Sequence, residues 1–167
     1  MRFFSRSMLI LFLLFCGFSP SHASGQLFMF ANPNIGTPAK DFTLKGADGS
    51  EINMTKFREG SKAILFFWAT WCPHCRAALH KLNENRQEYV KKDIKVLLVD
   101  IGEDAPMVNA YLKKNGIDMM VVLDEEQSLA DSYGIIGVPT FFLLDKNGVI
   151  RAAENALPDD YEEILSK

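Results

Sequence analysis

Four apolar runs mark the expected interior of this chain. They cover residues 63–68, 94–99, 119–123 and 140–144, and they are rich in β-branched or aromatic side chains. Continuous rather than alternating hydrophobicity over such short runs is typical of strands that are covered on both faces. We therefore expect four core strands that lie between layers of helix.

The segments between these runs have helical periodicity. Apolar positions in 73–91 recur at intervals of three and four residues, and Pro73 stands in the first turn, where its missing N–H costs nothing. We expect one amphipathic helix there, a second over 105–115 that Gly116 stops, and a short one over 128–133. Strands that alternate with helices predict an α/β fold with partly parallel strands.

Two hairpins and a closing helix complete the expected elements. Alternating residues on either side of a glycine-containing turn predict a hairpin of 42–44 and 52–54, ahead of the main fold. After the last core strand, the tight turn 145–148 predicts pairing with 149–153. The segment 159–167 is expected to form a helix.

The N-terminus differs from the rest of the chain. Arg2 and Arg6 precede an apolar run over 8–18, and small residues follow up to Ala23. This order is typical of a secretory signal peptide, and the run is shorter than the roughly 20 residues that span a membrane. We expect residues 1–23 to be a signal peptide, with an uncleaved anchor formed by 8–18 as the alternative, and hence a periplasmic or otherwise extracytoplasmic protein.

The remaining chain is expected to hold one domain. Residues 24–35 show no sustained period and are expected to form a linker, and the domain would then cover 36–167. Loss of Arg2 and Arg6 with the leader lowers the formal net charge from −3 to −5, which argues against nucleic-acid binding. We expect a monomer.

The chemistry is expected to reside in two cysteines. Removal of the leader also removes Cys16, so that the mature chain keeps only Cys72 and Cys75. Cys72 stands where a buried strand ends and a helix begins, and a spacing of three puts both sulfurs on one helix face within bridging reach. A thiolate at a helix N-terminus is stabilised by free N–H groups and by the helix dipole. We expect a redox-active disulfide with Cys72 as nucleophile and Cys75 as resolving residue.

Neighbouring residues are expected to tune this pair. Pro73 lacks an N–H, and His74 adds partial positive charge beside the thiolate, so that both favour the reduced form and a more oxidising pair. Trp71, next to Cys72, is placed to shape the substrate surface, whereas Trp68 ends a buried strand and is expected in the core. Pro139 directly precedes the last core strand, which suggests a turn, a sheet edge or a cis bond.

Metal binding is the alternative use of two such thiols. A zinc site would need further ligands, and His80 lies six residues from His74, on a different side of the helix. We therefore expect no metal and no other cofactor. Tight Cu(I) binding without disulfide reduction would instead favour a copper- or haem-pathway thiol-binding protein.

Together these motifs resemble the thioredoxin superfamily. The run Phe-Trp-Ala-Thr-Trp-Cys over 67–72 carries the resemblance, and 38–44 with 133–140 look like the TlpA/ResA branch of extracytoplasmic thiol-disulfide oxidoreductases. The match runs over about 36–150. It implies a thioredoxin-like α/β/α sandwich with an N-terminal β-hairpin extension and a central mixed sheet.

The resemblance also implies roles and partners. Pro139 would be a cis-proline that faces the cysteines, and Val138 would offer backbone hydrogen bonds to an extended substrate. The protein would be an exported protein-disulfide reductase or oxidase with protein thiol or disulfide substrates and a membrane redox partner, in cytochrome c maturation or in periplasmic disulfide formation. A thiol-dependent peroxidase is the alternative because 38–44 also resembles peroxiredoxins, and turnover of hydrogen peroxide would reveal it.

Two departures from the family pattern concern proton transfer. Many members carry an acid a few positions after the second cysteine, where this chain has Ala78, and thioredoxin has a buried aspartate where Phe66 stands. Such an acid relays a proton from the resolving thiol, so without one the deprotonation of Cys75 must use water, His74 or another group. The Pro-His dipeptide after Cys72 is that of the oxidase DsbA, whereas the overall frame resembles reductants, and the redox direction is open as well.

Overall fold

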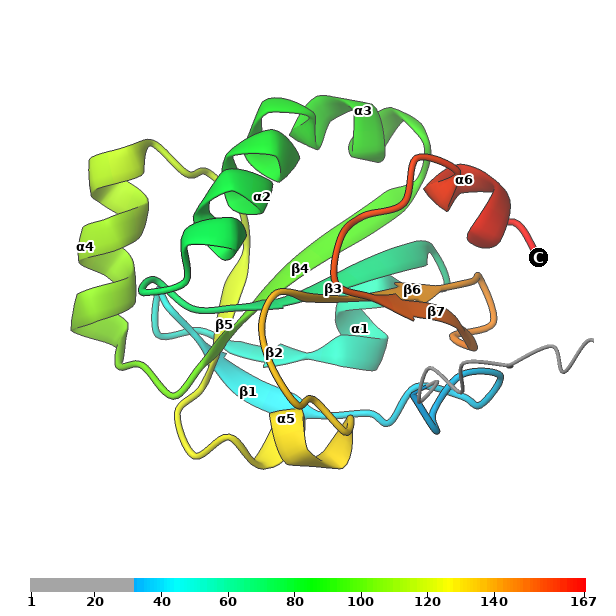
Figure 1. The fold of residues 1–167 in the computed structure, drawn as a ribbon, viewed down its shortest axis with the longest axis horizontal. Helices are drawn as coiled ribbons and strands as arrows, with labels where there is room; N and C mark the ends of the chain where they lie inside the picture. Colours follow the sequence, from blue (N-terminus) through cyan, green and yellow to red (C-terminus); the bar gives the residue numbers. More distant parts are fainter. Residues whose placement is uncertain (1–31) are drawn as a thin grey trace, which may run out of the picture.

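A seven-stranded mixed sheet forms the centre of the computed structural model, which describes residues 32–167 (Figure 1). The strands are β1 (Thr43–Gly46), β2 (Glu51–Asn53), β3 (Lys62–Trp68), β4 (Ile94–Ile101), β5 (Val121–Asp124), β6 (Thr140–Leu144) and β7 (Ile150–Glu154). Their order across the sheet is β2-β1-β5-β4-β3-β6-β7. The expected signal peptide lies outside the described residues, as does most of the expected linker.

The predicted core strands form the middle of the sheet. β3 pairs in parallel with β4, and β4 with β5, whereas β6 runs antiparallel to β3 and pairs with β7 in a hairpin. β4 is longer than its apolar run indicated, because the backbone of Asp100 continues to pair with both neighbouring strands. β5 starts at Val121 instead of residue 119.

The predicted N-terminal hairpin is present and joins the same sheet. β1 and β2 pair antiparallel, and β1 also pairs antiparallel with β5. The chain before this hairpin is bound to the domain as well. The side-chain amides of Asn32 and Asn34 donate to the carbonyl oxygen of Tyr133 at 2.8 and 3.0 Å, so the described end of the expected linker is a turn packed on the domain.

Six helices occur in the described part of the chain. They are α1 (Met54–Arg58), α2 (Pro73–Glu84), α3 (Arg86–Lys91), α4 (Ala105–Asn115), α5 (Ser128–Ser132) and α6 (Tyr161–Ile164). The prediction of one helix over 73–91 is wrong, because the chain breaks at Asn85, where ψ of 7° leaves the helical range and the side chain donates to the carbonyl of Lys81. α1 was not predicted, and it begins inside the expected second strand because Asn53 caps it by accepting from the backbone N–H of Lys56. The closing helix is shorter than expected.

The helices cover both faces of the sheet (Figure 1). α2, α3, α4 and α6 lie on one face, and α1 and α5 lie on the other. Side chains of β3 alternate between them, with Phe66 and Trp68 toward the α2 face and Leu65 and Phe67 toward the opposite face. The fold is therefore the predicted thioredoxin-like α/β/α sandwich. None of the helices in residues 32–167 combines the length and apolar character needed to traverse a bilayer.

Candidate active site

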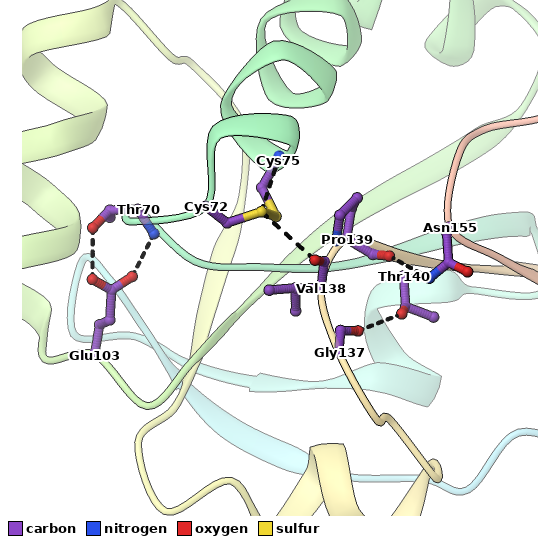
Figure 2. The surroundings of a disulfide bond; sticks show 9 residues. All are labelled: Thr70, Cys72, Cys75, Glu103, Gly137, Val138, Pro139, Thr140 and Asn155. Atoms are coloured by element: carbon purple, nitrogen blue, oxygen red, sulfur yellow. Dashed lines mark hydrogen bonds between the residues drawn. A yellow bond between two sulfur atoms is a disulfide. The ribbon is translucent and has the colours of Figure 1, made fainter.

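Cys72 and Cys75 are joined by a disulfide at the start of α2, with their Cα atoms 5.2 Å apart (Figure 2). Cys72 is the N-cap residue, and its sulfur accepts a hydrogen bond from the backbone N–H of Cys75 at 3.2 Å. Pro73 occupies the first turn, where it deprives the helix of no internal hydrogen bond. The sulfur of Cys72 therefore lies at the positive end of the helix dipole, where a thiolate is favoured.

The two cysteines differ in access to solvent. Cys72 is 4% exposed, whereas Cys75 is completely buried among the core residues of the α2 face. Trp71, the residue before Cys72, is 67% exposed, and Ile136 is fully exposed. Trp71, an apolar side chain that remains open to water beside the disulfide, is typical of a surface that meets a partner. Trp68 is fully buried, as expected of a core residue.

The chain before β6 faces the disulfide (Figure 2). The Val138–Pro139 peptide bond is cis, and the carbonyl oxygen of Val138 lies 3.7 Å from the sulfur of Cys72. A disulfide sulfur carries no proton, so this contact becomes a hydrogen bond only when Cys72 is a thiol. The side-chain amide of Asn155 donates to the carbonyl of Pro139 at 2.9 Å and holds the segment from the other side.

A mainly apolar cavity opens beside the cysteines, between α2 and the start of β6. His74 and Pro139 stand at the end of this cavity nearest the disulfide. Its other lining residues are Ala78, Lys81, Leu82, Tyr89, Phe141, Asn155, Ala156 and Leu157. The structure thus brings the predicted site residues of the β3–α2 loop and of the segment before β6 to one place.

Glu103 ties a second loop to the cysteine loop. Its buried carboxylate accepts hydrogen bonds from the backbone N–H and from the hydroxyl of Thr70, at 2.5 and 2.6 Å (Figure 2). Thr70 stands two residues before Cys72, so the loop after β4 fixes the approach to the reactive sulfur. No local motif predicts this link, because the two residues lie 33 positions apart in the chain.

Asp100 is a second acid that the sequence analysis did not identify. It is fully buried near the end of β4, and neither of its carboxylate oxygens has a hydrogen-bond partner in the described part of the chain. Burial, followed by the negative charge of Glu103, raises the pKa of Asp100 to about 8. The available signal was an acidic residue directly after an apolar strand run. By contrast, Phe66 packs in the core and stacks on Phe141 with ring centroids 4.4 Å apart.

Comparisons with known proteins agree with this geometry. A family model described as the AhpC/TSA family matches residues 35–153. Thiol-disulfide oxidoreductase ResA from Geobacillus thermodenitrificans (strain NG80-2) is 33% identical over 117 residues, which are 70% of this chain and 67% of the relative. ResA from Geobacillus kaustophilus (strain HTA426) is 32% identical with the same coverage.

Solved structures agree as well. StoA from Bacillus subtilis superposes with a TM-score of 0.64 at 26% identity, over 77% of this chain and 98% of that one. A thiol:disulfide interchange protein of the thioredoxin family from Chlorobium tepidum TLS gives a TM-score of 0.66 at 26% identity, over 78% of this chain and 94% of that one. The predicted resemblance to thioredoxin-like thiol-disulfide oxidoreductases is therefore confirmed.

Proposed function

Since this chain belongs to the AhpC/TSA family and is a thiol-disulfide oxidoreductase, we propose that it exchanges disulfides with protein substrates outside the cytoplasm, with Cys72 as nucleophile and Cys75 as resolving residue. One observation carries the assignment of roles. At a single helix N-terminus, Cys72 keeps 4% of its surface exposed, whereas Cys75 has none exposed. An external disulfide can meet only the first sulfur directly.

The exchange proceeds in two balanced steps. In the reducing direction, the Cys72 thiolate attacks one sulfur of the substrate disulfide, and the other substrate sulfur leaves as a thiolate. Cys75 then loses its proton and attacks the sulfur of Cys72, which forms the Cys72–Cys75 disulfide and releases the second substrate thiolate. Two electrons pass from the protein to the substrate, and the oxidising direction is the reverse.

The substrate is proposed to bind as an extended segment along Val138. Main-chain groups at this position lie beside the reactive sulfur and precede β6, so an added segment can bond to them as a strand would. The apolar cavity next to His74 then receives an apolar side chain that flanks the substrate cysteine. Trp71, exposed next to Cys72, supplies an apolar rim at the site.

The pathway follows from the redox direction. The resemblance to the TlpA/ResA branch favours a reductant that serves cytochrome c maturation, whereas the Pro73-His74 dipeptide favours an oxidant in periplasmic disulfide formation. Equilibration with glutathione separates the two. A reduction potential near the roughly −120 mV of DsbA indicates oxidation of substrates, and one near the roughly −270 mV of thioredoxin indicates reduction.

Export, a membrane redox partner and a monomeric state are parts of the same proposal. The leader pattern of Arg2, Arg6 and the apolar run over 8–18 supports export. The mass of the protein recovered from its native compartment tests it. A mass equal to residues 24–167 supports a cleaved signal peptide, and a full-length mass in the membrane fraction supports the anchor.

A trapping experiment tests the exchange itself. A Cys75→Ala variant should accumulate mixed disulfides with exported proteins through Cys72, because the resolving thiol is missing. Cys72→Ala is the matched control and should trap none, because Cys75 is buried. The proposed roles are wrong if Cys75→Ala captures no protein in the native compartment, or if Cys72→Ala captures as much.

A further inference from the structure

An ionisable side chain is buried on the cysteine side of the sheet. Along β4, Leu98 packs in the same core cluster as Cys75, so Asp100, two residues further on, points to the same face. Asp100 is in register with Trp68 on β3, four residues before Cys72. The carboxylate of Asp100 therefore lies on the α2 face, at the end of the sheet where β3 leads into the cysteine loop.

Three polar groups without hydrogen-bond partners meet in this region. They are both carboxylate oxygens of Asp100, Nε1 of Trp68 and the hydroxyl of Tyr111, each buried and unpaired within residues 32–167. The rings of Trp68 and Tyr111 lie 5.6 Å apart. Buried polar groups are nearly always paired in proteins, and an unpaired carboxylate is costly. No cation pairs with Asp100 within residues 32–167; Glu103 acts on it instead, through a side-chain contact that raises its pKa and a backbone N–H that lowers it.

The charge environment of Asp100 favours a neutral carboxyl that can still ionise. Glu103, three residues along the chain, supplies negative charge. The α2 face of the sheet also carries Tyr111 of α4. The positive charge of Arg76 on α2 acts to lower the pKa of the Tyr111 hydroxyl. Burial and Glu103 together raise the pKa of Asp100 to about 8. A group with this pKa exchanges protons readily near neutral pH.

We propose that Asp100 accepts the proton of the Cys75 thiol when Cys75 resolves a mixed disulfide, and returns it when the disulfide opens. The proposal rests on the roles given above to Cys72 and Cys75. The S–H bond of Cys75 breaks as its sulfur bonds to that of Cys72, the substrate sulfur leaves with the electron pair, and the proton moves to the carboxylate. Asp100 thereby serves where Ala78 and Phe66 replace the acids of related proteins.

The test follows both cysteines in one reaction. Reduced protein is mixed with the aromatic disulfide 5,5′-dithiobis(2-nitrobenzoate), and release of the coloured thiolate is recorded by stopped flow from pH 5.5 to 9. The first equivalent reports attack by Cys72, and the second reports attack by Cys75 on the mixed disulfide. General-base catalysis typically contributes at least about 100-fold, and with water as a substitute base we expect Asp100→Asn to slow the second phase at pH 7 by about 10-fold or more.

The pH profile separates proton transfer from a change of shape. In Asp100→Asn the second phase should rise steadily with hydroxide concentration, whereas the native protein should level off as Asp100 ionises. The first phase should change by less than about threefold. Tyr111→Phe is the matched control, because it removes an unpaired polar group from the same cluster without a carboxyl, and both phases should keep their rates and profiles.

Each outcome decides between the alternatives. An unchanged second phase in Asp100→Asn, or equal slowing of both phases, overturns the proposal. Absence of a first phase in the native protein refutes the role of Cys72 instead. If Asp100→Asn does not fold, infrared difference spectra of the native protein labelled with ¹³C-aspartate provide a second test. Reduction of the disulfide should change a protonated-carboxyl band, and an unchanged spectrum overturns the proposal.

Discussion

Replacement of Asp100 by Asn should stabilise the oxidised protein, increasingly so as the pH rises. Asp100 is fully buried and its carboxylate is unpaired, so the ionised form is disfavoured in the folded state. Its pKa is raised from 3.8 to about 8, mainly by burial and then by Glu103. Asn has nearly the same shape and never ionises. The oxidised protein is the right state, because the disulfide keeps Cys72 and Cys75 from titrating.

The size of the effect follows from proton linkage. A carboxyl whose folded pKa lies above its unfolded pKa keeps its proton in the native state between pH 4 and 8, after the unfolded chain has lost it. The native state then binds more protons, so the stability of the native protein falls with rising pH in that window. Each pH unit is worth about 1.4 kcal/mol. The advantage of Asp100→Asn should therefore grow by about 4 kcal/mol between pH 5 and pH 8.

Urea denaturation of both oxidised proteins at pH 5, 6, 7 and 8 measures this advantage. Only the difference between the two free energies of unfolding is used, because all other titrating groups are common to both. Tyr111→Phe should show a difference that is constant with pH over this range. A constant difference for Asp100→Asn would refute the raised pKa of this carboxyl, and would leave it in its ordinary range.

Three further substitutions test other contacts. Phe66→Ala should lower the free energy of unfolding by about 3–5 kcal/mol, measured by urea denaturation, because the ring is fully buried and stacked on an aromatic neighbour. At pH 5, Glu103→Ala should cost about 1–3 kcal/mol in the same assay, because the N–H and hydroxyl of Thr70 lose their acceptor. Burial alone raises the pKa of Asp145, but hydrogen bonds from the backbone and Arg151 outweigh it and hold the pKa low. Arg151→Met should therefore cost about 1–3 kcal/mol at pH 7, and the cost should shrink as the pH is lowered through the depressed pKa of Asp145 and its carboxyl gains a proton.

Local signals were sufficient for much of the frame. The four core strands follow from uninterrupted apolar runs, and α4 ends where predicted because Gly116 adopts a φ of 63° in the left-handed region. The break at Asn85 was not predictable in the same way. Helical periodicity continues through it to the buried Tyr89, and only the backbone angles and the side-chain hydrogen bond of Asn85 show that α2 ends there.

The site residues also divide into those that local sequence signals predict and those that they do not. The placement of Cys72 and Cys75 follows from a short motif, because their spacing along the helix decides their geometry, whereas the cis-proline role of Pro139 came from the resemblance to the family. Glu103 contacts Thr70 only because parallel pairing of β3 and β4 brings the ends of both strands to one edge of the sheet. A link of this kind depends on strand register, which no local pattern in either segment encodes.

The register between β3 and β4 also explains how a buried acid can stand on β4 in this chain, where thioredoxin carries it at the position of Phe66 on β3. Phe66 on β3 pairs with Leu98 on β4, and both side chains face α2. An acid at Phe66 would remove an aromatic stack from the core, whereas Asp100 lies one strand away, beside Trp68, where the adjoining loop already carries Glu103. Moving the carboxylate to β4 keeps it on the face and at the end of the sheet that the cysteines occupy, and leaves the core of β3 fully apolar. The proposed proton acceptor for Cys75 is therefore constrained by face and by depth along the strands, and not by the strand that carries it.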